Sequence, residues 1–205
     1  MTNEEIKEYE LLKKKNDLEN YAFEFWQKLS DNIFKPNLPT DLLPLTIKIT
    51  QPNDPINIYT GTTTSRLLPS GASIYFVTVL FRPCDSVNIV QRRIRHELLH
   101  LALKLSKLKS SDFDAVFKIL CDYYDANFYK KLTGLEKELY DRTIDLMNQG
   151  IRLLKGNTFE YANIQMKHMI EVLGNTEITE ESQIDSVVEK LDKIMKESYA
   201  IINGR

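Results

Sequence analysis

The chain contains few of the residues that mark special classes of protein. Its 205 residues include two cysteines, seven glycines, seven prolines and three histidines, and no apolar run long enough to cross a bilayer. Cys84 and Cys121 cannot build a disulfide framework and lack the paired spacing of a zinc–thiolate site, so both are read as free thiols. The charged stretch 1–15 lacks the apolar core of a signal peptide. These absences predict a cytoplasmic protein without a membrane partner.

No strong charge of either sign is present. The formal net charge is -2, which gives no electrostatic footprint for nucleic acid, and nucleic acid is therefore not an expected partner. With 42% hydrophobic and 27% charged residues, the composition is that of an ordinary soluble globular protein rather than a disordered or collagen-like chain. The length suits one domain, or one domain with a helical extension.

The periodicity of apolar residues predicts an α+β chain with a small sheet between helices. Alternation over Leu45–Ile49 and the β-branched and aromatic run Ile74–Phe81 predict strands, and a second short strand is expected at 57–61. The stretch between Pro36 and Pro44 is read as a connector, and 62–70 as a polar loop. Helices are expected at about 3–34, 87–107, 111–131, 135–154, 158–173 and 180–202. The predicted divisions are an N-terminal helix with connector (1–44), a core (45–133) and a C-terminal helical extension (134–205).

The pattern that points to chemistry is His96-Glu97-Leu98-Leu99-His100, inside the predicted helix 87–107. Positions i and i+4 lie one above the other on a helix, so both imidazoles can bind one tetrahedral ion. Glu97 would then take a proton from a zinc-activated water as general base. An ordinary buried helix with two incidental histidines would leave Glu97 unexplained, because buried carboxylates are rare unless they are paired. The pattern therefore predicts a Zn²⁺ site with His96 and His100 as ligands.

The third metal ligand is open at this stage. His168, the remaining histidine, lies far along the chain and is read as an ordinary surface or core-edge residue. Asp112 and Asp114 stand where the next helix is expected to begin, with Ser111 as its cap, and carboxylates are normal zinc ligands. Capping alone would also explain acidic residues there. Asp122 and Asp125 are the second choice.

The run His-Glu-Leu-Leu-His-Leu-Ala-Leu, followed by a short basic spacer and Asp-x-Asp-x-x-Phe, resembles SprT-like zinc metallopeptidases and their phage-borne relatives. The resemblance covers about residues 45–130 and implies a zincin-like core, a peptidase activity and a peptide or protein substrate. Better-known members have a third histidine before that Phe, where this chain has Asp112, Phe113 and Asp114. The resemblance therefore implies an aspartate as third ligand, Asp112 ahead of Asp114. The helices beyond Gly134 match no family that we can name.

Further expectations concern the surroundings of the motif. The strand Ile74–Phe81 is the candidate to pair with an extended substrate. The phenols of Tyr123, Tyr124 and Tyr129 are possible oxyanion donors, although aromatic packing explains them better. The three arginines before the motif, Arg92, Arg93 and Arg95, are read as a solvated helix face. The alternative function is a non-catalytic module, either zinc-containing or derived from a zincin, that binds a partner protein.

Overall fold

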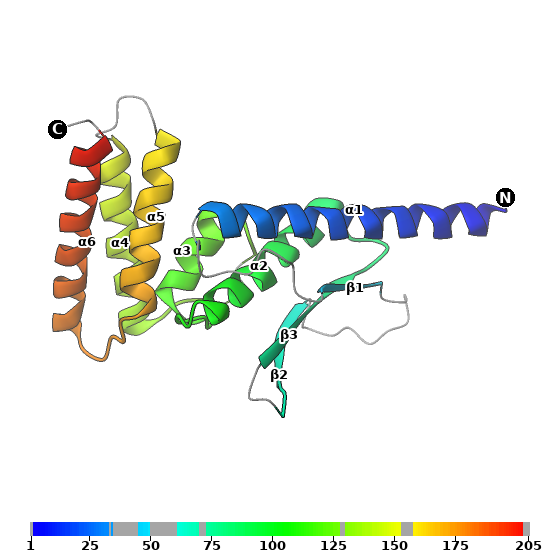
Figure 1. Cartoon of the computed structure of the whole chain (residues 1–205), viewed down its shortest axis with the longest axis horizontal. Coiled ribbons are helices and arrows are strands. Elements are labelled where there is room, and N and C mark those ends of the chain that lie inside the picture. The colour runs from blue at the N-terminus through cyan, green and yellow to red at the C-terminus, as the bar shows by residue number, and fades with distance from the viewer. Residues whose placement is uncertain are drawn as a thin grey trace.

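The computed structural model describes residues 2–32, 34, 45–49, 61–69, 73–127, 130–152 and 158–202. The predicted connector 36–44, the predicted strand residues 57–60 and Tyr129 lie outside these ranges. Within them the chain is mostly helical and includes one small mixed sheet, which confirms the α+β class (Figure 1). The elements are α1 (Asn3–Asn32), β1 (Leu45–Ile49), β2 (Gly61–Leu67), β3 (Ser73–Phe81), α2 (Val87–Leu105), α3 (Ala115–Tyr123), α4 (Gly134–Arg152), α5 (Thr158–Gly174) and α6 (Glu181–Ile202).

The sheet has the strand order β1-β3-β2. β1 runs parallel to β3, with Leu45 opposite Val77, and β2 runs antiparallel to β3, with Thr63 opposite the same Val77. Ile47 is buried between exposed Thr46 and Lys48, as the alternation predicts. β1 and β3 therefore confirm the two strands expected from β-branched residues.

Two predictions about the sheet are wrong. The segment 62–70 was expected to be a polar loop, but Gly61–Leu67 forms β2. Its threonines suit a strand, and their polarity fits an edge strand whose side chains are mostly exposed. The second error concerns Ile74–Phe81 as the substrate-binding strand. β3 is central and is paired on both sides, so its backbone has no open edge for an extended peptide.

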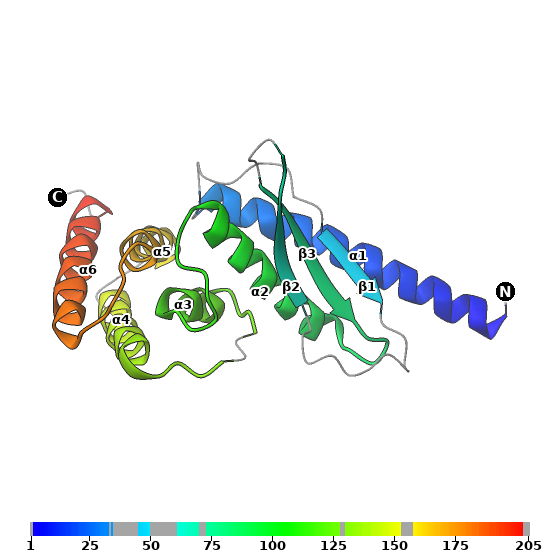
Figure 2. The same cartoon turned by 90° about the horizontal axis from the view of Figure 1, so that it is seen from below.

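Helices α1 and α2 cover one face of the sheet (Figure 2). The C-terminal half of α1 packs on α2 and β1 through an apolar stripe at helical spacing, which includes the fully buried Trp26 and Leu29. From β3, Val77, Val79 and Phe81 point into the same core. Helix α2 is buried on nearly every side from His96 to Leu103, so the motif lies on the central helix of the fold.

The end of α2 turns the chain back alongside this helix. Lys107 takes a left-handed conformation (φ 58°), and Leu108 N–H donates to Leu103 O at 2.9 Å, as in a Schellman motif. The next helix, α3, begins at Ala115 and ends at Tyr123, although the sequence predicted 111–131. Asp125 (φ 50°) ends it with a second turn of this kind, in which Ala126 N–H donates to Cys121 O at 2.8 Å.

The C-terminal helices α4, α5 and α6 pack side by side as an up-and-down bundle, and α3 joins it to α2 (Figure 1). Their positions confirm the three helices that the glycines at 134, 156 and 174 were expected to separate. The divisions of the chain at 44 and 133 stay predictions. No helix of the described residues combines the length and the apolar character needed to cross a membrane.

Candidate metal centre

The two histidines of the motif project from the same side of α2 toward the loop that follows it. The His96 side chain is almost wholly buried and that of His100 is mostly buried. After the turn at Lys107 the chain runs back alongside α2, so that Ser110 and Asp112 come to lie beside His100. Asp112 is thus brought to the motif by the loop between α2 and α3.

Three potential ligand atoms face one another at this place. His96 Nε2 and His100 Nε2 are 3.2 Å apart, and Asp112 Oδ1 lies 3.4 Å from the first and 3.2 Å from the second. In a tetrahedral zinc site with ligand distances of about 2.0–2.1 Å, two ligand atoms are about 3.3–3.4 Å apart. Among the described residues, this trio is the group of His, Cys, Asp or Glu side chains placed to hold one ion.

The hydrogen bonds of the imidazoles decide which ring nitrogens hold protons. His96 Nδ1 lies 2.5 Å from Asn127 O, and His100 Nδ1 lies 2.7 Å from Ser110 O. A carbonyl oxygen only accepts, so both Nδ1 atoms donate, and the Nε2 of a neutral ring is then unprotonated. Asp112 Oδ1 is buried, and its polar neighbours are the two Nε2 atoms. When both rings are neutral, three lone pairs converge here, an arrangement that a cation would stabilise.

The electrostatic surroundings of His96 and Asp112 favour the protonation states in which these side chains bind a metal. Burial, followed by the charge of His100, lowers the pKa of His96 to about 4, so this ring is neutral at pH 7. The contact with His100 is the main cause that lowers the pKa of Asp112, against the effect of burial. A neutral imidazole and an ionised carboxylate are the forms that bind a metal.

Neighbouring elements fix the two rings. Phe117 of α3 stacks on His100 with ring centroids 3.8 Å apart, and it meets His96 edge-on at 5.0 Å. The carbonyl that orients His96 belongs to the turn after α3, and this turn is held by α2. There Arg95 donates to Asp125 O at 2.6 Å, and Arg92 pairs with the Asp125 carboxylate at 2.8 Å.

Glu97 lies against β2 rather than in solvent. Its carboxylate Oε2 accepts a hydrogen bond from Thr63 Oγ1 at 2.7 Å, and Lys104 Nζ donates to Thr63 O at 3.1 Å. Burial raises the pKa of Glu97, and the Thr63 hydrogen bond opposes that shift. The charges of His100 and Asp112 also act on this carboxyl, so it belongs to the same electrostatic site.

Gly61, at the start of β2, is required by this arrangement. A Cβ atom at this position would lie 2.6 Å from Glu97 Oε1 and 2.7 Å from its Cγ, closer than real Cβ atoms approach a neighbour. Sequence reasoning missed Thr63 because 62–70 was read as loop, and it assigned no role to Gly61, the last residue of the strand expected at 57–61. The available signal was the run of three threonines after the glycine, which favours a strand.

Comparison with protein-family models, with characterised proteins and with solved structures found no match. The resemblance to SprT-like peptidases therefore depends on the motif and the aspartates after it. What the site can do is inferred from its own contacts.

The other acidic and histidine candidates are engaged elsewhere. Asp114 stands at the N-cap position of α3 without a side-chain capping bond and turns toward its own loop, where its Oδ2 accepts from Ser111 N–H at 2.7 Å and Lys109 lies 3.8 Å from its Oδ1. Asp122 pairs with Lys118, and Asp125 pairs with the arginines of α2. His168 lies on α5, half exposed, 3.5 Å from Glu171.

The prediction of a solvated arginine face is wrong for two of the three residues. Arg93 is buried, forms an ion pair with Asp85 at 2.5 Å and donates to Leu80 O at 3.2 Å. Arg95 is mostly buried and also donates to Tyr21 OH at 2.7 Å. Both arginines form these pairs because α2 is buried at these positions, and a buried guanidinium must be paired.

Tyr123 and Tyr124 serve packing, as expected for these aromatic residues. Tyr124 is buried with its ring edge-on to Phe25, at a centroid distance of 5.3 Å. Tyr123 donates from its hydroxyl to Asn163 Oδ1 of α5 at 2.9 Å. Their contacts tie α3 to α1 and to the bundle, and give neither phenol a position beside the three ligand atoms.

We expect Gly61→Ala to destabilise the fold by about 1–3 kcal/mol, because the added methyl group overlaps the Glu97 side chain. The same change in a Glu97→Ala background should cost much less, since the overlapping atoms are gone. Urea unfolding of the four chains of this cycle measures the coupling. An equal cost in both backgrounds would show that Gly61 does not contact Glu97.

The two cysteines should differ sharply toward alkylating reagents. Cys84 is exposed, whereas Cys121 is buried with its Sγ 3.9 Å from His96 Nδ1, and burial raises its thiol pKa far above the usual range. Native protein should therefore take up one iodoacetamide per chain, and urea-unfolded protein two, as read by mass spectrometry. Rapid native modification of both thiols would contradict the burial of Cys121.

Proposed function

We propose that this chain is a zinc-dependent metallopeptidase in which His96, His100 and Asp112 hold the metal and Glu97 is the general base. The observation that supports this most strongly is the trio of potential ligand atoms, mutually 3.2–3.4 Å apart, in which the buried Asp112 Oδ1 faces the two imidazole nitrogens. With both imidazoles neutral, a purely structural role would leave that oxygen unsatisfied at a cost in stability.

The donor set suits zinc. Two imidazole nitrogens and one carboxylate oxygen are common ligands of zinc in hydrolases, and three protein ligands leave one position for water or substrate. When bound, zinc lowers the pKa of a water molecule toward about 7 and polarises a carbonyl group. The protein fixes the ligands beforehand through the carbonyls of Ser110 and Asn127 and the ring of Phe117.

Glu97 has the environment of a general base. Burial raises its pKa, which makes its carboxylate a better proton acceptor than an exposed glutamate, and the Thr63 hydroxyl orients one oxygen. The same carboxyl can hold the proton and pass it to the departing amine of the cleaved bond.

The substrate we propose is an extended peptide segment along β2. Within the described residues β2 is paired only with β3, so its other edge can accept a peptide by strand addition. Because β2 also contacts Glu97 through Gly61 and Thr63, a peptide on that edge would pass the general base. A small sheet with its edge strand beside the motif helix is the layout expected of a zincin core, which we propose here.

The test is hydrolysis of an unfolded protein, such as casein, by zinc-loaded protein purified without a metal-affinity tag. We expect cleavage that stops when a chelator removes the metal and returns when zinc is added back. The His100→Ala variant, prepared in parallel, controls for a contaminating protease. Cleavage that persists equally in the chelated sample or in His100→Ala would overturn the assignment, as would zinc-loaded protein that cleaves nothing.

A further inference from the structure

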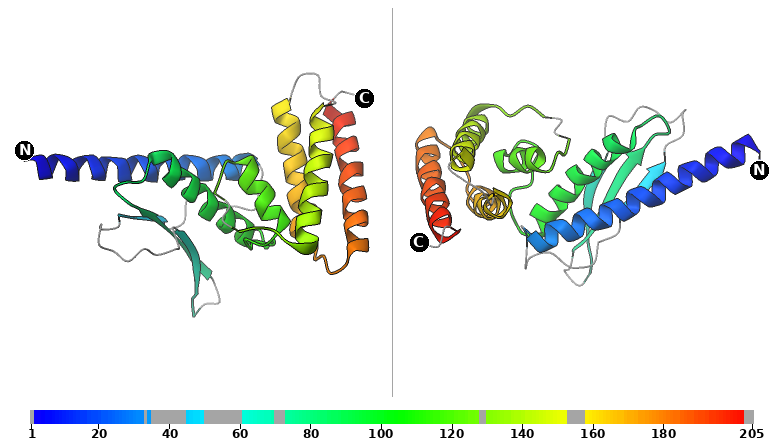
Figure 3. Two further views of the ribbon diagram at one scale, coloured as in Figure 1. Left: turned by 180° about the vertical axis from the view of Figure 1, so that it is seen from behind. Right: turned by 90° about the horizontal axis from the view of Figure 1, so that it is seen from above.

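The first turns of α1 are exposed, and Leu11 is the first residue of the helix that packs against the core. Figure 3 shows the N-terminal end of the helix extending beyond the sheet and α2. Every residue from Thr2 to Glu10 is exposed, and the first buried residue of the helix is Leu18. An isolated helix of this length is marginal in water, because helical stability in proteins comes mainly from packing. A surface that covers this segment would therefore stabilise it.

An apolar stripe runs along the overhanging segment. Ile6, Tyr9 and Leu12 are 41%, 62% and 49% exposed, and their spacing of three places them on one side of the helix. Nine positions separate Tyr9 from Leu18, about two and a half turns, so the stripe faces away from the side that packs on α2. Packing against the core of this chain therefore does not account for the apolar character of these three positions.

Charge along the same segment is divided into two blocks. Residues 4–10 contain four glutamates and one lysine, whereas residues 13–15 are three consecutive lysines. Two such helices side by side in parallel would place like charges together. In an antiparallel arrangement centred on Tyr9, Glu4 and Glu5 of each helix lie against Lys14 and Lys13 of the other, and the like-charge pair is Glu8 with Glu10.

We propose that a second copy of this chain covers the stripe, through an antiparallel, two-fold pairing of the α1 helices centred on Tyr9. Ile6 of each copy then meets Leu12 of the other, and the two Tyr9 rings meet at the axis. An interface of this kind uses the same patch on both subunits, as closed dimers require. The stripe is symmetric about Tyr9, so the register that pairs its apolar residues also pairs Glu5 with Lys13. This interface is small, and the dimer forms reversibly with concentration.

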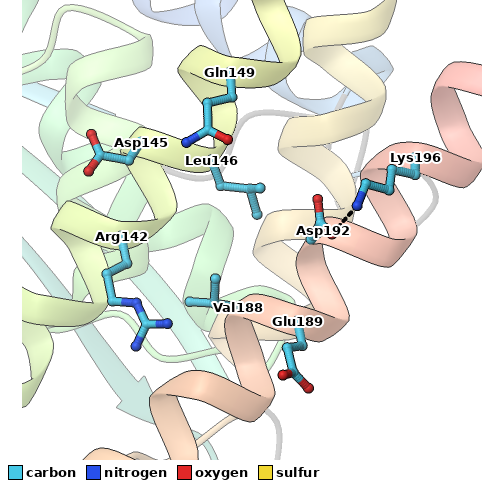
Figure 4. A pocket seen from close by; sticks show the side chains of 8 residues that line it. All are labelled: Arg142, Asp145, Leu146, Gln149, Val188, Glu189, Asp192 and Lys196. Carbon is cyan, nitrogen blue, oxygen red and sulfur yellow. Dashed lines mark hydrogen bonds and ion pairs between the residues drawn. The ribbon is translucent and has the colours of Figure 1, made fainter.

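The groove between α4 and α6 of another copy is an alternative partner for the stripe. A groove of about 500 Å³ lies between α4 and α6, where Leu146 and Val188 form an apolar floor between charged side chains (Figure 4). The stripe of one copy placed in the groove of another would build open chains instead of a closed dimer. The groove has no separate acidic and basic ends to match the charge blocks of α1, because basic and acidic side chains occur together on both helices that line it.

Cysteine cross-linking in a Cys84→Ser background tests the pairing and its register, since Cys121 is buried. Tyr9→Cys should form a disulfide dimer under mild oxidation, and Lys7→Cys, on the other side of the helix, should not. Ile6→Cys and Leu12→Cys should cross-link with each other when mixed, and neither with itself, because disulfides need Cα atoms about 4.4–6.8 Å apart.

Sedimentation of the unmodified chain should show a mass that doubles with increasing concentration, and Tyr9→Asp should hold it at the monomer. A wild-type chain that stays monomeric would overturn the proposal. A disulfide dimer of Ile6→Cys with itself would also overturn it, because it indicates parallel helices. So would an association that Val188→Asp abolishes and that Tyr9→Cys does not trap as a disulfide, because this result places the stripe in the groove. None of these results depends on metal or on peptidase activity.

Discussion

Asp112→Ala is expected to weaken zinc binding more than about 100-fold, the upper range for losing a residue that only supports a ligand. Removing Asp112 leaves two imidazoles and takes away the negative charge that offsets the metal. In metal-free protein the change removes the attraction between Asp112 and His100 that lowers the pKa of this carboxyl, so it should also cost some stability at neutral pH. Competition with a fluorescent zinc chelator gives the affinity, and urea unfolding without metal gives the stability.

Asp114→Ala is the matched control for that result. Asp114 lies two residues further on and accepts from Ser111 N–H in the same loop, so its loss should cost about 0.5–1.5 kcal/mol of stability. Its effect on zinc should be small. The reverse pattern, with zinc lost in Asp114→Ala and kept in Asp112→Ala, would move the third ligand to Asp114. Loss of zinc binding in His168→Ala alone would contradict the position of α5.

Glu97→Gln is expected to lower kcat for peptide hydrolysis about 10²–10⁴-fold while zinc content stays at the wild-type level. Glutamine keeps the shape of the side chain and can still meet the Thr63 hydroxyl, but it cannot accept a proton at neutral pH. Substrate binding should change little, so the loss should appear in kcat rather than KM.

The zinc content and the unfolding curve of Glu97→Gln, measured on the same sample, separate a lost base from a damaged site. Thr63→Val offers a graded comparison, because it keeps the Glu97 carboxylate and removes the hydroxyl that donates to Glu97 Oε2 and to the Glu97 main-chain oxygen. Its kcat should lie between those of wild type and Glu97→Gln. Wild-type turnover by Glu97→Gln would assign the base to another residue.

Features of the fold that depend on local periodicity could be predicted from the sequence. The apolar repeat gives α2 and the three late helices to within a few residues, and the His96–His100 spacing places both imidazoles on one side of α2. β2 was missed because an edge strand shows little alternation, and its partner β3 decides its conformation.

The choice between Asp112 and Asp114 could not be made from the sequence. It depends on the left-handed turn at Lys107, a residue type that rarely adopts positive φ, and on the Ser111 hydrogen bond and Lys109 ion pair that hold Asp114 in its own loop. The arginines of α2 were misread for a related reason. Their partners, Asp85 and Asp125, are distant in sequence or belong to turns that no periodic pattern reveals.

The most direct test of the metal centre is the zinc content of the wild-type protein. Protein purified without chelator or metal-affinity tag, dialysed against metal-free buffer and analysed for elements, should contain about one zinc per chain. The His96→Ala/His100→Ala double variant, treated identically, should contain almost none. Metal well below one per chain in wild type, not recovered after zinc is added back, would contradict the metal centre and the peptidase proposal that depends on it.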